Sequence, residues 1–124
     1  MQNLSQHISK LREDFSKGKL SETDVQKNPA TQFEIWLQQA IDAQIEEAQA
    51  MVLSSVSENN LPHSRILYLR GFENNTYRFF GNYNSTKGKN ISLNPNACIN
   101  FFWNPLQRQI RIEGTVSKLS AAES

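Results

Sequence analysis

The sequence has little of what several classes of protein require. It contains a single cysteine, Cys98, so no disulfide can form within the chain and a reducing compartment is expected. No apolar run approaches the roughly 20 residues that span a bilayer, and the N-terminus has no apolar signal core. With 124 residues, the chain is predicted to be a small cytoplasmic protein with one hydrophobic core.

Residues typical of metal and catalytic centres are also scarce. The two histidines, His7 and His63, lie far apart in the sequence and neither has a cysteine or carboxylate cluster beside it, so no metal site is expected. Nucleophile-elbow, phosphate-loop and dinucleotide-binding motifs are absent from the sequence. Cys98 lies among strand-forming residues and is expected to be a small apolar side chain rather than a nucleophile. No residue is therefore assigned as catalytic.

The net charge of +1 hides two halves of opposite sign. Residues 1–50 carry a net charge of −3, and residues 51–124 carry +4. Between Ser64 and Arg111 there are seven basic residues and one acid, Glu73. The near-neutral total argues against a histone-like polycation, whereas the basic half suits a ligand that carries phosphate.

Hydrophobic periodicity predicts two helices in the first half. One is expected over residues 4–15, and a longer one over residues 32–49. In the longer segment an apolar stripe opposes a polar face, which is typical of a helix that lies on an apolar surface. Thr31 and Glu34 form a capping-box pattern at its start.

From residue 51 the pattern changes to the period-two alternation of strands. The expected strands cover residues 51–57, 64–72, 77–83, 97–104 and 108–120, and a short helix is expected over 85–95. This pattern predicts an α+β, mainly β fold, a small antiparallel barrel with the N-terminal helices packed outside. Residues 1–30 are expected to form an N-terminal helix and connecting segment, and residues 31–124 the barrel domain.

Basic and hydroxyl side chains make a candidate phosphate site in the second half. Lys87 and Lys89 begin the expected short helix, next to Ser85 and Thr86, where cations oppose the helix dipole and do not stabilise the helix. Hydroxyls, free backbone N–H groups and ammonium groups are good phosphate donors. A solvated basic surface explains the same residues equally well.

The strand faces expected for two arginines and two phenylalanine pairs indicate a ligand or a second subunit. Arg65 and Arg70 are five residues apart, so a regular strand places them on opposite faces. The pairs Phe79-Phe80 and Phe101-Phe102 occupy both faces of their strands, so one of each pair must meet a helix, a subunit or a flat ligand. Two ligand classes fit: nucleic acid with its bases stacked on aromatics, and a phosphorylated planar cofactor such as flavin mononucleotide (FMN).

Several segments resemble the pyridoxamine 5′-phosphate oxidase family, and they occur in the family's order. They are LREDFSKGKL (11–20), NPATQFEIWLQQA (28–40), RILYLR (65–70), FFGNYNSTKGKNISLNPNACINFFW (79–103) and LQRQIRIEGTVSKLS (106–120). The resemblance implies a homodimeric split β-barrel that binds FMN at its subunit interface. It also implies a role in vitamin B6 metabolism: the oxidation of pyridoxamine or pyridoxine 5′-phosphate to pyridoxal 5′-phosphate with oxygen, which yields hydrogen peroxide.

The resemblance implies site residues position by position. The implied FMN contacts are Arg65, Ile66, Leu67, Tyr68, Leu69, Arg70, Phe80, Gly81, Ser85, Thr86, Lys87 and Gln109. The implied substrate contacts are Arg12 and Arg70. Because FMN itself carries the redox chemistry, no protein nucleophile is required.

The sequence departs from the family pattern at several of these positions. Arg70 stands in place of a lysine, Gly81 in place of a threonine and Thr86 in place of an arginine, while Phe15 replaces a tyrosine. Losing one charge-assisted hydrogen bond costs on the order of 1.5–3 kcal/mol, so FMN binding is expected to be weaker or the substrate different.

Family members also continue well beyond Ser120, so a fragment, a truncated gene product or a shortened relative is expected. This leaves two further hypotheses beside the oxidase. One is a protein that binds FMN or pyridoxal phosphate without oxidase activity. The other is a nucleic-acid-binding barrel, against which the acidic first half argues.

Overall fold

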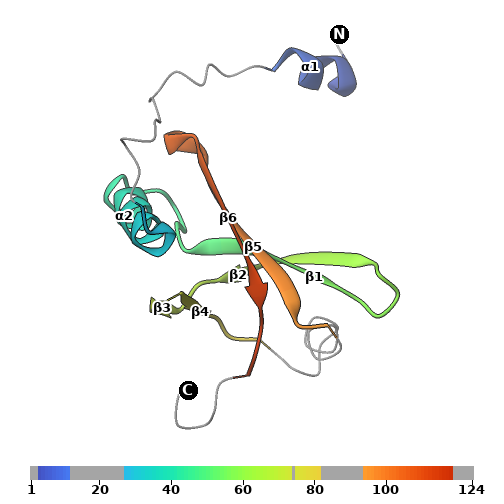
Figure 1. Cartoon of the computed structure of the whole chain (residues 1–124). Coiled ribbons are helices and arrows are strands. Elements are labelled where there is room, and N and C mark those ends of the chain that lie inside the picture. Colours follow the sequence, from blue (N-terminus) through green and yellow to red (C-terminus); the bar gives the residue numbers. More distant parts are fainter. Residues whose placement is uncertain (1–2, 12–26, 74, 82–93, 119–124) are drawn as a thin grey trace.

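The fold is described from a computed structural model, in which the described residues are 3–11, 27–73, 75–81 and 94–118. Helices α1 (Leu4–Lys10) and α2 (Pro29–Asp42) precede two antiparallel sheets (Figure 1). The larger sheet has the order β2-β1-β5-β6, with β1 at Ala50–Val56, β2 at Pro62–Tyr68, β5 at Asn96–Trp103 and β6 at Arg108–Thr115. The smaller sheet pairs β3 (Gly71–Glu73) with β4 (Thr76–Arg78), and a 3-10 turn at Asn104–Leu106 joins β5 to β6.

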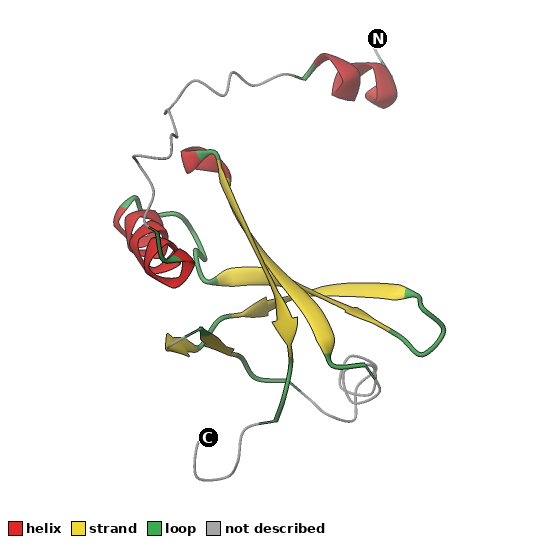
Figure 2. Ribbon diagram, in the orientation of Figure 1, coloured by secondary structure: helices red, strands yellow, loops and turns green. Residues whose placement is uncertain are grey.

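The chain crosses from one sheet to the other between Leu69 and Arg70. The Leu69 N–H donates to the Gln49 carbonyl at 2.9 Å and extends the ladder of the larger sheet, whereas the Arg70 N–H donates to the Arg78 carbonyl of the smaller sheet at 2.8 Å. The single strand expected over 64–72 is therefore wrong, because a corner divides it into β2 and β3. Figure 2 shows the small sheet lying beside the larger one, to which this corner joins it.

Helix α2 begins and ends earlier than the sequence pattern predicts. Its N-cap is Asn28, whose side-chain oxygen accepts the Ala30 N–H at 2.9 Å, and Pro29 takes the first helical position. The expected capping box at Thr31 is therefore wrong. The helix stops at Asp42, and the N–H groups of Gln44 and Ile45 donate to the carbonyls of Ile41 and Ala40. This is a Schellman ending with Gln44 at the left-handed position, φ 59°.

One hydrophobic core lies between α2 and the two sheets. Phe33 of α2 is 3% exposed and sits at its centre. Its ring meets Phe72 and Tyr77 of the smaller sheet edge-on, at 5.3 and 5.4 Å between centroids, and lies 5.2 Å from Phe101 of the larger sheet. Helix α2 thereby holds both sheets together.

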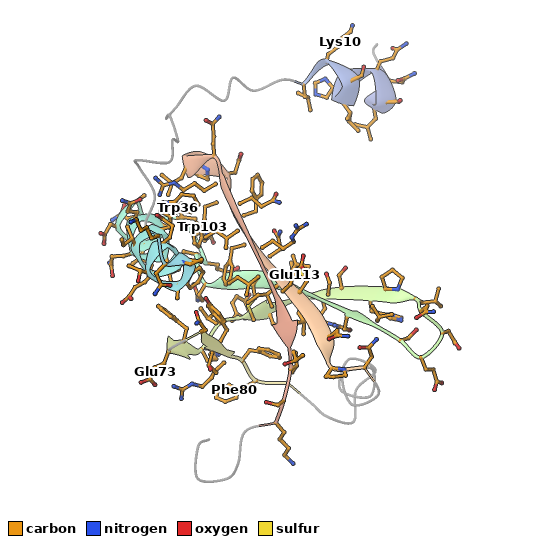
Figure 3. All side chains as sticks on the ribbon, viewed as in Figure 1. Lys10, Trp36, Glu73, Phe80, Trp103 and Glu113 are labelled. Carbon is orange, nitrogen blue, oxygen red and sulfur yellow. The ribbon has the colours of Figure 1, made fainter. Side chains whose placement is uncertain are left out.

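A buried tryptophan fixes the segment that follows α2. The Trp103 indole N–H donates to the Ala48 carbonyl at 2.9 Å, and both residues are buried. Figure 3 shows Trp103 beside α2, close to Trp36. A buried carbonyl needs such a donor, since an unsatisfied one costs about 1–3 kcal/mol.

Side chains of the larger sheet alternate between a core face and an outer face. On the core face, Leu53 pairs with Arg65 and Ile99, and Ile99 pairs with Ile112. We call the opposite side the outer face; its members are Ala50, Val52, Ser54, Val56, Pro62, Ser64, Ile66, Tyr68, Asn96, Cys98, Asn100, Phe102, Gln109, Arg111, Glu113 and Thr115. The alternation predicted for the last strand is confirmed over Arg108–Thr115, where Ile110 and Ile112 are half-buried and Gln109, Arg111 and Glu113 are exposed.

Other expected elements agree in part. The strands expected over 51–57 and 97–104 are confirmed to within one residue at each end, whereas that expected over 77–83 leaves the sheet after Arg78. Most of the helix expected over 85–95 lies outside the described residues. Helix α1 covers the first part of the helix expected over 4–15 and has no buried residue. Among the described residues, no helix is long and apolar enough to cross a membrane.

Candidate functional site

Arg65 is a half-buried cation that no carboxylate neutralises among the described residues. Its Nη1 group donates to the Ser55 hydroxyl at 3.0 Å, and no acid in the described part of the chain lies within ion-pair distance of it. Burial lowers the pKa of the guanidinium from its ordinary value, yet an arginine stays protonated at neutral pH. An unneutralised cation in partial burial attracts an anion more strongly than one in open water.

A row of residues without large apolar side chains crosses the sheet at Ser55. Ser55 pairs with His63 and with Ala97, and Ala97 pairs with Gly114, so these four residues form one row across the core face. A Cβ atom at Gly114 would meet nothing within 4 Å. The apolar core therefore ends before this row, and the open space lies at Gly114 of β6, the sheet edge opposite the strand that carries Arg65.

Tyr68 and Arg70 form a second polar group at the end of β2. The Tyr68 hydroxyl donates to the Glu47 carboxylate at 3.1 Å, and this hydrogen bond raises the pKa of Tyr68. The Arg70 guanidinium lies 6.0 Å from the centre of the Tyr68 ring, within the range of a cation–π contact. Arg70 is exposed, so its charge faces solvent while its guanidinium lies over the Tyr68 ring.

The other expected contacts in the β2 region point in different directions. Ile66 is 66% exposed on the outer face, whereas Leu67 faces the core and Leu69 is buried. Phe80 is 74% exposed (Figure 3), and Gly81 is exposed beside it. In each aromatic pair, Phe101 and Phe79 pack in or against the core while Phe102 and Phe80 are exposed, so the expectation that one member meets a helix, a subunit or a ligand stays a prediction.

Gln109 lies far from β2 within one chain. It is exposed on the outer face, paired with Phe102. The strands β2 and β6 are the two edges of the larger sheet, three strand spacings apart, or about 14 Å. The described contacts therefore do not converge on one pocket of a single subunit. The remaining expected contacts, Arg12, Ser85, Thr86 and Lys87, lie outside the described residues, as does Lys89.

A shallow groove of about 280 Å³ separates α2 from β6. It is lined by Pro29, Gln32, Phe33, Trp36, Gln109, Ile110 and Arg111. At its side, the Arg108 guanidinium stacks 4.7 Å from the centre of the Trp36 ring and donates a hydrogen bond to Gln39. These contacts fasten α2 to β6 and place Gln109 next to the helix. In the described part of the chain, no group of three or more potential metal ligands occurs.

Two residues of these polar groups, Ser55 and Glu47, are not identified as site residues from the sequence. Ser55 had a detectable signal, because it follows Met51 and Leu53 at the inward positions of a strand and is a polar residue where an apolar one is expected. Glu47 had no such signal. It contacts Tyr68 because the chain after α2 turns through a positive φ of 52° at Glu47, which residue spacing does not reveal.

Solved structures with the same architecture define the fold class. PhzG of Burkholderia lata, solved with tetrahydrophenazine-1-carboxylic acid, matches with a TM-score of 0.80 at 23% identity over 86% of this chain and 54% of that one. A pyridoxamine 5′-phosphate oxidase-related FMN-binding protein of Nostoc punctiforme matches with a TM-score of 0.61 at 24% identity, over 73% of this chain and 51% of that one. These likenesses confirm the predicted antiparallel split β-barrel, whose sheets stay unclosed over the described residues.

Sequence relatives define the family. The family model described as pyridoxamine 5′-phosphate oxidase matches residues 37–124. A pyridoxine/pyridoxamine 5′-phosphate oxidase of Cyanothece sp. is 45% identical over 117 residues, and one of Burkholderia mallei is 40% identical over 117; each match covers 94% of this chain and 55% of the relative. The chain belongs to the pyridoxamine 5′-phosphate oxidase family and spans about half the length of these relatives.

Proposed function

We propose that the chain is the FMN-binding part of a flavin-dependent pyridoxamine 5′-phosphate oxidase. The observation that supports this most directly is Arg65, a half-buried guanidinium whose described hydrogen-bond partner is the neutral Ser55 hydroxyl. An FMN phosphate carries nearly two negative charges and fits such a cation. The reaction we propose is the one that the names of its relatives suggest, oxidation of pyridoxamine or pyridoxine 5′-phosphate, with oxygen as the proposed oxidant, in a cytoplasmic enzyme of vitamin B6 metabolism.

The proposed roles of the residues follow from their chemistry. Arg65 binds the FMN phosphate together with Ser85, Thr86 and Lys87, as the family resemblance implies. Gln109 has an amide donor and an amide acceptor, which suit the polar edge of a flavin ring. Ile66, Leu67, Tyr68, Leu69, Phe80 and Gly81 complete the proposed FMN contacts.

Two arginines are proposed to bind the substrate. Arg70, exposed and stacked on Tyr68, attracts the anionic substrate, and Arg12 reaches the same molecule. When bound, FMN supplies the redox chemistry. The chain itself contributes a positive field and fixed orientation, and no covalent step on a protein side chain is required.

A homodimer is part of the proposal. The outer face exposes two large apolar side chains, Ile66 of β2 and Phe102 of β5, at 66% and 62%, and apolar groups exposed on a sheet surface suit an interface with a second subunit. Gln109 and β2 lie at opposite edges of the sheet. We therefore propose that one subunit supplies Gln109 and the other subunit supplies Arg65 to the same FMN.

The test is a titration of the chain with FMN, followed through quenching of flavin fluorescence, and then an assay for pyridoxal 5′-phosphate. Lys87→Ala should weaken FMN binding about 10- to 100-fold, because it removes one charge-assisted bond to phosphate. Lys89→Ala is the matched control and should bind FMN like the wild type. Absence of FMN binding contradicts the proposal, and equal effects of the two variants contradict the role given to Lys87.

A second candidate function is FMN binding without turnover, since a structural neighbour is described as an oxidase-related, FMN-binding protein. It predicts normal FMN titration with no pyridoxal 5′-phosphate formed. Adding the remaining family-length polypeptide in trans or by fusion should then restore turnover, which separates this function from the oxidase.

A further inference from the structure

We propose that Ser55 is a positioning residue that orients Arg65 toward the FMN phosphate. This inference rests on the proposed function. Ser55 is 2% exposed and is the one buried polar side chain among the described residues. Its hydroxyl accepts the hydrogen bond from Arg65 Nη1 at 3.0 Å, from the neighbouring strand of the same sheet.

The chemistry of a hydroxyl partner suits this role. A carboxylate at position 55 would neutralise the guanidinium and compete with a bound anion. A serine hydroxyl accepts one of the five guanidinium N–H groups, leaves the positive charge intact and leaves the other N–H groups for a ligand. Holding a long side chain in one rotamer before the ligand arrives also reduces the entropy lost on binding.

The position of Ser55 favours a functional reason over a packing one. Met51 and Leu53 occupy the preceding core-face positions of β1, and both are buried. A hydroxyl buried in such a row is unfavourable unless it is hydrogen-bonded, and the bond it makes is to Arg65. Leu53 lies directly opposite Arg65 in the sheet register, on the same core face.

The experiment compares FMN with riboflavin, which lacks the phosphate. Ser55→Ala should raise the Kd for FMN about 3- to 10-fold and leave the Kd for riboflavin unchanged, because one hydrogen bond that orients the phosphate ligand is lost. Ser55→Thr keeps the hydroxyl and should restore the wild-type ratio of the two constants. Thr31→Ala, an exposed hydroxyl-bearing residue of α2 outside the proposed site, is the control and should bind both flavins like the wild type.

The outcomes separate this inference from the proposed function. If Ser55→Ala weakens FMN and riboflavin equally, or neither, Ser55 has no positioning role and the inference is overturned while the proposed function stands. If the wild-type chain binds no FMN, both are overturned. Should Ser55→Ala fail to fold, as circular dichroism would show, Ser55→Cys takes its place, since a thiol has similar size and is a weak acceptor.

Discussion

At the scale of single residues, Tyr77 shows how the core changes the chemistry of a side chain. It packs edge-on against Phe33, and burial raises the pKa of its hydroxyl above the ordinary 10.0. A raised pKa in the folded state means that the folded protein holds this proton more tightly than the unfolded chain does. The stability it confers is therefore present below pH 10 and is lost as the pH rises through the folded-state pKa.

We expect the free energy of unfolding to fall as the pH rises above about 10. Tyr77→Phe should make this fall shallower, because the group that titrates differently in the two states is gone. The measurement is urea denaturation between about pH 8 and 11. Tyr68 also has a raised pKa, through Glu47, so the Tyr77→Phe, Tyr68→Phe double variant should be flatter still. A double variant as steep as the wild type would refute this explanation.

The sequence indicates that Arg65 and Ile66 lie on opposite faces of a strand, but it does not indicate which residue Arg65 contacts. Alternation along RILYLR separates Arg65 from Ile66, and the structure places them on opposite faces. The pairing of Arg65 with Ser55 depends on the register of β1 against β2, which the turn between them sets. A single sequence predicts that a turn exists near Asn60, but not the register that it produces.

At the scale of elements, the start of α2 offers a direct test of its cap. The Asn28 side chain accepts the Ala30 N–H, so Asn28→Ala should lower the free energy of unfolding by about 1 kcal/mol. Thr31→Ala is the matched control, because Thr31 lies inside the helix and is exposed; its loss should change stability by less than about 0.5 kcal/mol. Urea denaturation of the two variants measures both effects. If Thr31→Ala lowered the free energy of unfolding more than Asn28→Ala, Thr31 rather than Asn28 would be the N-cap.

At the end of α2, apolar residues continue at helical spacing beyond the last residue of the helix. Ile45 and Ala48 continue the apolar spacing, and both still pack on the core although the backbone has left the helix after Asp42. Gln44 and Glu47 adopt positive φ without the glycine that usually marks such a position. The same reasoning applies to the corner at Leu69–Arg70, where apolar alternation continues across a change of sheet.

At the scale of the whole molecule, the exposed apolar side chains of the outer face lead us to expect that two copies of the chain form a dimer. Phe102→Lys should convert a dimer to a monomer, because it replaces an exposed apolar side chain of the proposed interface with a charge. The fold itself should be unaffected, since Phe102 is already 62% exposed. Ile41→Lys, on the exposed side of α2 at 52%, is the control and should remain dimeric. Sedimentation velocity reports both; a wild-type chain that is monomeric at every concentration contradicts the dimer.

The fold of the molecule was easier to predict than its site. Period-two alternation and turn residues indicate short antiparallel strands whatever their final arrangement, and the helical stripe of α2 needs only an apolar surface to cover. The site depends on how strands are ordered across the sheet, and this order separates Gln109 from Arg65. Residues such as Lys87, expected from family resemblance, lie outside the described part of the chain.

The central claim is that this chain binds FMN, and co-sedimentation tests it most directly. The chain is mixed with a smaller amount of FMN and followed in the ultracentrifuge at the visible absorption of the flavin, which the protein alone does not have. The account predicts that the flavin absorption moves with the protein, at a rate expected for two chains. Flavin that sediments as the free small molecule, with folded protein in excess, would contradict the account.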